Sequence, residues 1–222
     1  NLRARHHGCV LTIGNFDGVH RGHQALLTRL KQEGKRLGLP VMVMIFEPQP
    51  LELFSADKAP ARLTRLRDKC HYLADAGVDY LLCVRFNRDF AANSAHDFVK
   101  KLLVEKLGVK YLMVGDDFRF GAGREGDYEL LKLAGAQFGF TVTNSDSFCE
   151  GNKRISSTAV RQALQEDKLD LAESLLGHPY SISGRVVHGD EVGRTIGFPT
   201  ANLPLKRLVA PVKGVYAVDV YG

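Results

Sequence analysis

The sequence predicts an α/β domain, with helices on both faces of a parallel sheet, followed by a shorter all-β segment. Short apolar runs alternate with longer helical stretches from Cys9 to about Val142. Residues 41–46 are apolar at every position, which is typical of a strand buried on both faces. The alternation stops after Ser157, and from residue 181 the chain is rich in glycine and β-branched residues. Strands that alternate with helices favour a parallel sheet.

The expected elements follow one another along the chain. Strands are expected at residues 9–13, 41–46, 80–84, 111–114 and 140–143, and helices at residues 24–37, 65–76, 94–107, 128–138, 158–165 and 170–176. Leu26, Leu30 and Leu37 give the first helix its amphipathic spacing. Parallel sheets bind ligands outside the carboxyl ends of their strands, so we expect the site at that edge.

A turn at residues 177–179 separates two expected units. Residues 1–180 form the α/β domain, and residues 181–222, strand-like at 183–187 and 214–218, form the first part of a β-barrel. A barrel needs more strands than these to close its edges, so we expect the second unit to be truncated.

Composition excludes several classes of protein. With 45% hydrophobic and 25% charged residues, the chain is neither disordered nor of low complexity. No apolar run approaches the roughly 18 residues of a membrane helix, so no membrane partner is expected. The four cysteines are far apart and form no C-x-x-C pair, which argues against a zinc knuckle or a disulfide framework and favours the cytoplasm.

The net charge of +5 does not indicate a nucleic-acid partner. The 30 basic residues are interleaved with 25 acidic ones, and no basic tail or aromatic–basic stripe appears. Proteins that bind duplexes usually concentrate Lys and Arg on one face or in one run. A mild basic excess fits polyanionic small molecules as ligands.

The most informative segment is the loop after the first strand, residues 12–23, with the sequence TIGNFDGVHRGH. Gly14 and Gly18 permit close backbone approach to a ligand, and the following helix start favours phosphate. His20 and His23 can project toward one ligand and donate to oxygens that gain charge. A metal pair would need further ligands nearby, which are missing; the residues alone leave phosphate contact, a metal pair and surface histidines open.

Residues 121–126, GAGREG, satisfy the G-x-G-x-x-G pattern of dinucleotide-binding proteins. The pattern follows its strand by six residues and lies in a late βα unit rather than the first. We therefore expect a Gly-rich loop with Arg124 available to a phosphate, and no NAD binding.

Five blocks, in order and across nearly the whole chain, resemble the bifunctional bacterial riboflavin kinase/FMN adenylyltransferase family, the prokaryotic FAD synthetases. The first block also looks like the H-x-G-H signature of the nucleotidyltransferase superfamily. The blocks are GNFDGVHRGH at residues 14–23, FEPQP at 46–50, GDDFRFG at 115–121, RISSTAVR at 154–161 and GFPTAN at 197–202.

The resemblance implies an FAD synthetase that transfers AMP from ATP to the phosphate of FMN, with pyrophosphate as the second product. The FMN phosphate oxygen attacks the α-phosphorus directly, and Mg²⁺ neutralises the polyphosphate. Catalysis then depends on alignment and on stabilising the leaving pyrophosphate.

The resemblance also implies which residues carry this chemistry. The catalytic residues are His20 and His23, which also bind ATP. The further implied ATP-binding positions are Gly14, Asn15, Phe16, Asp17, Asp117, Arg154, Ser157 and Arg161. The implied flavin-binding positions are Phe46, Pro48, Pro50, Phe54 and Phe118.

Simpler interpretations of the same residues stay open. Ser157 and Arg161 could be a plain helix cap with a solvated arginine, and the pair Asp116 and Asp117 a turn rather than a contact to Mg²⁺ or ribose. The aromatic–proline cluster could be packing.

In the second unit, the resemblance assigns Thr200 and Asn202 to Mg²⁺ and ATP phosphates of a riboflavin kinase. The family's catalytic Glu would lie beyond residue 222, so kinase activity toward riboflavin is expected of the parent protein rather than of these residues. Two other functions are kept as alternatives: a nucleotidyltransferase for another small phosphate substrate, and a non-catalytic flavin or nucleotide sensor.

Overall fold

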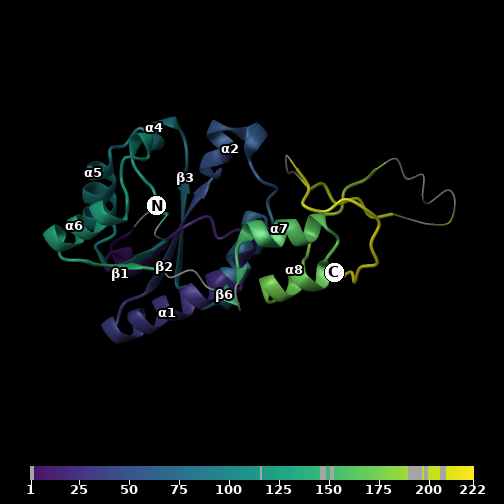
Figure 1. Ribbon diagram of the computed structural model, residues 1–222, viewed down its shortest axis with the longest axis horizontal. Coiled ribbons are helices and arrows are strands. Elements are labelled where there is room, and N and C mark those ends of the chain that lie inside the picture. The colour runs from purple at the N-terminus through teal and green to yellow at the C-terminus, as the bar shows by residue number, and fades with distance from the viewer. Residues whose placement is uncertain are drawn as a thin grey trace.

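A five-stranded parallel sheet organises the structure, a computed structural model that describes residues 3–115, 117–145, 149–150, 153–189, 197, 200–205 and 209–222. The strands run in the order β3-β2-β1-β4-β5, and every neighbouring pair is parallel (Figure 1). They are β1 (Cys9–Ile13), β2 (Val41–Glu47), β3 (Tyr80–Arg85), β4 (Val109–Val114) and β5 (Thr141–Asn144). The predicted fold class is confirmed.

Helices cover both faces of this sheet. The longer ones are α1 (Arg21–Leu37), α3 (Leu66–Asp75), α6 (Tyr128–Phe138), α7 (Ser157–Gln165) and α8 (Leu169–Leu176). The short ones are α2 (Pro50–Phe54), α4 (Arg88–Ala91) and α5 (Ala95–Asp97), which continues as a π-helix over Phe98–Lys106. A small hairpin pairs β6 (Cys149–Glu150) with β7 (Lys153–Arg154).

Hydrophobic clusters on both faces of the sheet fix these layers. On one face, Val43, Ile45 and neighbouring side chains meet Leu27 of α1 and Leu73 of α3. On the other face, the side chains of β1, β2 and β4 that point the opposite way meet α5, the π-helix and α6. Successive residues of a strand point to opposite faces of the sheet. Because helices cover both faces, a central strand such as β2 is apolar at nearly every position.

The pair α7 and α8 forms a third cluster, around Leu63 and Val160. The chain beyond α8 returns to α3: the ring of His178 stacks on Tyr72 at 4.2 Å between centroids, and Ser183 Oγ donates to Asp68 at 2.5 Å. Figure 1 shows this last part of the chain beside α7 and α8, away from α5 and α6.

The second unit carries less regular structure than its sequence pattern predicts. Beyond residue 180, the β-pairing that the described residues make is one isolated bridge, between Val187 and Asn202. The strand-like run at residues 214–218 has no partner strand among the described residues, and an extended segment needs neighbours to form a stable sheet.

Helix α1 approaches the sheet closely at Gly34, which is buried. A Cβ atom there would lie 2.9 Å from the carbonyl oxygen of Leu39, 3.1 Å from Val41 and 3.2 Å from Val10. Glycine at this position therefore allows the helix to lie against the strands.

We expect Gly34→Ala to lower the free energy of unfolding by about 1–3 kcal/mol, although alanine is the better helix former, because the added methyl group overpacks the contact. Chemical denaturation measures this difference. Lys35→Ala, on an exposed neighbour in the same helix, should stay within about 0.5 kcal/mol of the parent protein. An unchanged stability of Gly34→Ala would show that the contact tolerates a side chain.

Candidate active site

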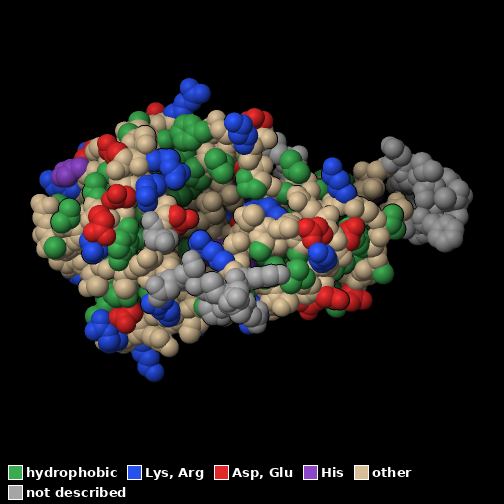
Figure 2. All heavy atoms as spheres, viewed as in Figure 1, with side chains coloured by type: hydrophobic (Ala, Val, Ile, Leu, Met, Phe, Trp, Pro, Cys, Tyr) green, Lys and Arg blue, Asp and Glu red, His purple; other side chains and the backbone are tan. Residues whose placement is uncertain are grey.

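The loop that follows β1 lies where the sheet offers a ligand site. Its strand stands between β2 and β4: the chain passes from β1 to β2 and β3 on one side, and the connection from β3 then crosses to β4 on the other side. At such a switch point, the loops beyond the carboxyl ends of the strands separate and leave a crevice. Figure 2 shows a face of the molecule that is hollowed near its middle, with Lys and Arg side chains beside the hollow.

His20 and His23 form a stacked pair at the start of α1. His20 is the N-cap residue, and its Nδ1 accepts a hydrogen bond of 3.3 Å from the backbone N–H of His23. The two rings lie 3.6 Å apart between centroids, with 21° between their planes. Because Nδ1 of His20 accepts, the proton of the neutral ring sits on Nε2.

Gly22 leaves room for this pair. A Cβ atom at residue 22 would lie 3.1 Å from the ring of His20 and 3.1 Å from the carbonyl oxygen of Ile155. The glycine thus lets the start of α1 approach the chain just before α7, which joins two segments that are far apart in sequence.

Phe16 covers the other side of His23. Its backbone is left-handed, with φ of 47°, and its ring lies 4.7 Å from that of His23 between centroids. Nδ1 of His23 is shielded from solvent and has no hydrogen-bond partner among the described residues. The imidazole is therefore held between two rings and retains an unused polar atom.

Burial keeps both imidazoles neutral. It lowers the pKa of His20 to about 4, and this effect exceeds the opposing attraction of Asp17; Arg161 and Arg154 lower it further. The pKa of His23 lies well below its usual range, first through burial and then through the charges of His20 and Lys69. At neutral pH, the pair can donate hydrogen bonds but carries no charge.

Asp17 connects the loop to two other segments of the chain through hydrogen bonds. Its carboxylate is 2% exposed and accepts from the backbone N–H groups of Leu63 and Thr64, at 3.0 Å and 3.1 Å. Nη2 of Arg161 donates to it at 2.5 Å. The sequence predicts Asp17 as an ATP contact; in this structure its carboxylate is directed at the protein, and the ATP role stays a prediction.

The first turn of α7 meets the loop from the far side. Ser156 caps the helix, and Oγ of Ser157 donates to the carbonyl oxygen of Asp17 at 2.9 Å, across 140 residues of sequence. Nε of Arg161 donates to the carbonyl oxygen of Ala61 at 2.5 Å. Arg154, on β7, is near enough to influence His20. The structure thus brings all three predicted α7-side residues to the loop.

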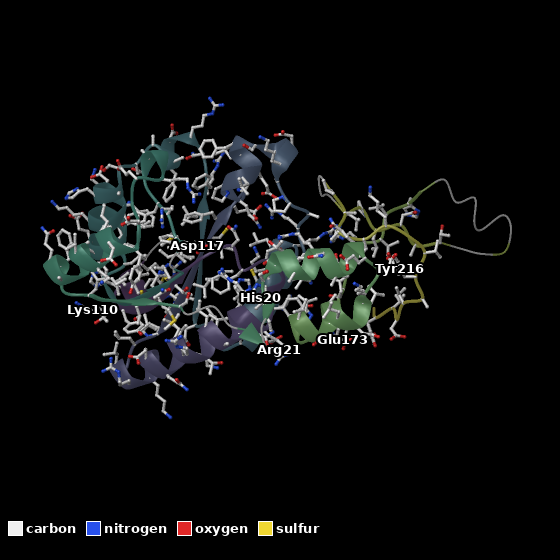
Figure 3. The ribbon with its side chains drawn as sticks, in the orientation of Figure 1. His20, Arg21, Lys110, Asp117, Glu173 and Tyr216 are labelled. Carbon is white, nitrogen blue, oxygen red and sulfur yellow. The ribbon has the colours of Figure 1, made fainter. Side chains whose placement is uncertain are left out.

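Asp117 follows β4, the strand paired with β1, and so lies at the same edge as His20 (Figure 3). Its Oδ1 would lie 2.8 Å from a Cβ atom at Gly115. Gly14 is less restricted, since a Cβ atom there would lie 3.3 Å from the ring of Phe16. Asp116 lies outside the described residues.

Four of the predicted flavin positions, Phe46, Pro48, Pro50 and Phe54, lie at the end of β2 or just after it, and Phe118 follows β4. They are accompanied by aromatic rings that were not predicted. Phe46 lies 5.4 Å from Phe86 and 5.8 Å from Phe90, and Phe54 lies 6.0 Å from Phe86, between ring centroids. Phe54 is 60% exposed. Phe118 stacks on Phe120 at 5.7 Å and also contacts the core below the sheet.

An ion-pair triad braces this side and was not predicted. Arg62 contacts Glu47, at the end of β2, with an N–O distance of 2.7 Å, and also Glu52 of α2. Hydrogen bonding to Arg62 lowers the pKa of Glu52. Pro48 and Pro50 lie between the two glutamates, so the triad ties down the segment that holds them.

The predicted kinase positions lie apart from this loop in sequence. Thr200 is exposed, and the carbonyl oxygen of Asn202 accepts from the N–H of Val187 at 2.9 Å. A Cβ atom at Gly189 would lie 2.3 Å from the amide nitrogen of Asn202. Residues 190–196 and 198–199, which include part of the GFPTAN block, lie outside the described residues.

The described residues contain no group of three or more His, Cys, Asp or Glu side chains placed to hold a metal ion. None of their helices is long and apolar enough to cross a membrane.

Comparison with known proteins matches both units. The model of the FAD synthetase family matches residues 2–159, and that of the riboflavin kinase family matches residues 176–222. The bifunctional riboflavin kinase/FMN adenylyltransferase of Escherichia coli K12 is 71% identical over 220 residues, 99% of this chain and 70% of that protein. The protein of the same name from Haemophilus influenzae is 55% identical, over 96% and 69% of the two chains.

A solved structure has the same fold. The crystal structure of a protein named macrolide-efflux protein, from Streptococcus pneumoniae, superimposes with a TM-score of 0.76 at 31% sequence identity. The match covers 94% of this chain and 68% of that one.

The buried neutral state of His20 makes stability depend on pH. Between pH 6.5 and 4, the unfolded chain binds a proton at this residue that the folded chain does not, so the free energy of unfolding falls as the pH falls, by up to about 3 kcal/mol from His20. In urea titrations over this range, His20→Gln should flatten the dependence, and His96→Gln, at an exposed position, should leave it unchanged. An equal slope for His20→Gln and the parent protein would contradict the assignment.

Proposed function

The chain belongs to the family of bifunctional riboflavin kinase/FMN adenylyltransferases, and we propose that its α/β part transfers AMP from ATP to the phosphate of FMN, which gives FAD and pyrophosphate. ATP and FMN are the substrates of this unit, and riboflavin is the further substrate of the kinase unit.

The observation that carries the proposal is the convergence of phosphate-binding groups at the end of β1. The N-terminus of the 17-residue helix α1 lies there, and that of α7 reaches the same loop. Helix N-termini bind phosphate through their backbone N–H groups and the helix dipole. Two buried imidazoles add donors, and Arg154 and Arg161 add positive charge.

The reaction forms one bond and breaks another at the α-phosphorus. An oxygen of the FMN phosphate attacks, and the bond to the β-phosphate oxygen breaks, so no covalent bond to the protein is needed. We assign His20 and His23 to donate hydrogen bonds to phosphate oxygens that gain charge. A neutral imidazole does this without losing its proton, so it does not have to be reprotonated between turnovers.

The remaining ATP positions act around this pair. Ser157, Arg161 and Arg154 hold the β- and γ-phosphates, which orients pyrophosphate as the leaving group. Gly14 and Asn15 allow the backbone to approach the nucleotide, and Asp117 meets it from the end of β4. Asp17 holds the guanidinium of Arg161 in place, so Asp17 affects ATP binding indirectly, by positioning Arg161.

Mg²⁺ fits this donor set as an ion carried by the polyphosphate. The described residues hold no cluster that would bind it alone, and Mg²⁺ characteristically combines few protein oxygens with substrate phosphates and water. In the kinase unit, the hydroxyl of Thr200 and the amide oxygen of Asn202 are oxygen donors of the kind it accepts. When bound, the ion would neutralise charge on the phosphates.

The flavin ring is assigned to the aromatic wall beyond β2. Phe46, Pro48, Pro50, Phe54 and Phe118 supply apolar surface to an isoalloxazine ring, and the exposed Phe54 has a free face. We assign residues 1–180 to the adenylyltransferase domain and residues 181–222 to the kinase domain; the FAD synthetase model ends at residue 159, and the riboflavin kinase model begins at residue 176, before this boundary. Free thiols at Cys9, Cys70 and Cys83 and the need for ATP support a cytoplasmic location.

Product analysis tests the proposal directly. The protein is incubated with FMN, ATP and Mg²⁺, and FAD and pyrophosphate are quantified together. Equal amounts of both products support adenylyl transfer. FMN binding without product would favour a sensor, and turnover of another phosphate substrate in place of FMN would overturn the substrate assignment.

We expect His23→Ala to lower kcat by about tenfold to a thousandfold, because the variant loses a donor to the charge that develops on the phosphate oxygens. Steady-state FAD formation measures it. His96→Ala, at an exposed position on α5, is the matched control. A kcat equal to that of the control would remove His23 from its assigned role.

A further inference from the structure

Lys69 of α3 is a buried lysine under the phosphate loop that the reaction as assigned above does not use. Its side chain is 1% exposed, and Nζ donates to the carbonyl oxygen of Asn15 at 2.6 Å. Lysine is almost never fully buried unless its charge is paired. None of the ion pairs found within the described part of the chain includes Lys69.

The acidic groups around this ammonium group are engaged elsewhere. Asp17 on the loop is paired with Arg161, and Glu47 at the end of β2 is paired with Arg62. The other charged or titratable groups that interact electrostatically with Lys69 are Arg62, Glu52 of α2, Cys83 of β3 and His23 of α1. The direct partner of the ammonium group is thus a backbone carbonyl, and burial lowers the pKa of Lys69.

The carbonyl that it holds belongs to a constrained part of the loop. Asn15 directly precedes Phe16, whose φ of 47° is in the left-handed region that a side chain other than glycine rarely adopts. The ring of Phe16 then lies against His23. A continuous set of contacts therefore runs from Lys69 through Asn15 and Phe16 to the imidazole.

We propose that Lys69 is a positioning residue for adenylyl transfer: its ammonium group fixes the Asn15 carbonyl, so that Phe16 holds His23 in place, and it adds positive charge beneath the bound triphosphate. This inference rests on the proposed function. It predicts an effect on ATP and on the chemical step, and little effect on FMN, because the aromatic wall lies beyond β2.

The competing interpretation is that Lys69 only fills volume. Lys69→Met keeps an unbranched side chain of similar size but removes the charge and the donor, whereas Lys69→Arg keeps both. Lys31→Met is the matched control, because Lys31 is an exposed lysine of α1 whose Nζ lies close to Gly77, which precedes the amino end of β3 and so lies at the edge of the sheet opposite the loop.

The experiment measures kcat and both KM values for FAD formation, the affinity for a non-hydrolysable ATP analogue by calorimetry, and Tm. We expect Lys69→Met to lower kcat about tenfold to a hundredfold and to weaken analogue binding about tenfold, with the KM for FMN within about twofold of the parent protein. Lys69→Arg should restore kcat to within about fivefold, and Lys31→Met should match the parent protein.

Two results would overturn the proposal. One is a Lys69→Met variant with parental kcat and analogue affinity; the other is an equal loss of FMN and ATP affinity, which general loosening would produce. If Lys69→Met does not fold, the test rests on Lys69→Arg. A Lys69→Arg variant that keeps the parental Tm but loses more than about tenfold in kcat would reject the proposed role of Lys69. Absence of FAD with the parent protein would instead reject the proposed function, while the analogue affinities would still test Lys69.

Discussion

One buried carboxylate holds the candidate active site together. Asp17 is almost fully shielded from water, so its negative charge must be met by donors from the protein. The structure supplies them from two distant segments: the amides of Leu63 and Thr64, and the guanidinium of Arg161, which is 144 residues away in sequence. The loop after β1, the chain before α3 and the first turns of α7 converge because this charge requires all of them.

The proposed mechanism gives the two histidines and the cations around them different tasks. Burial keeps His20 and His23 neutral, so the proposal assigns them to donate hydrogen bonds, and it assigns the positive charge to Arg154, Arg161 and Lys69. Neutral donors in a shielded pocket can stabilise the negative charge that develops on phosphate oxygens during the reaction. Fixed cations attract the polyphosphate before the reaction begins. The pair is oriented by packing as much as by hydrogen bonds, since its rings stack on each other and on Phe16.

The sequence predicts the fold better than it predicts the connections within the site. The run at residues 41–46 and the helical spacing of α1 are local patterns, and local patterns determine strands, helices and their order. The ion pair between Asp17 and Arg161 is not local, and neither residue type reveals its partner. In the sequence, Lys69 is indistinguishable from any other lysine of an amphipathic helix. It is buried because α3 packs under the loop, which no local pattern predicts. The short helices α2 and α4 carry too few residues for a periodic signal.

The dependence of the ATP site on Asp17 is tested most directly by a double-mutant cycle on ATP-analogue affinity, with Asp17→Asn, Arg161→Met and the double variant, each checked for parental Tm. If the carboxylate acts by holding the guanidinium, the second substitution should cause no further loss. The double variant should then bind the ATP analogue as tightly as whichever single variant binds it less tightly, which corresponds to a coupling energy of about 1–3 kcal/mol. Losses that add fully would mean that the two side chains act independently, and would contradict the central role given to Asp17.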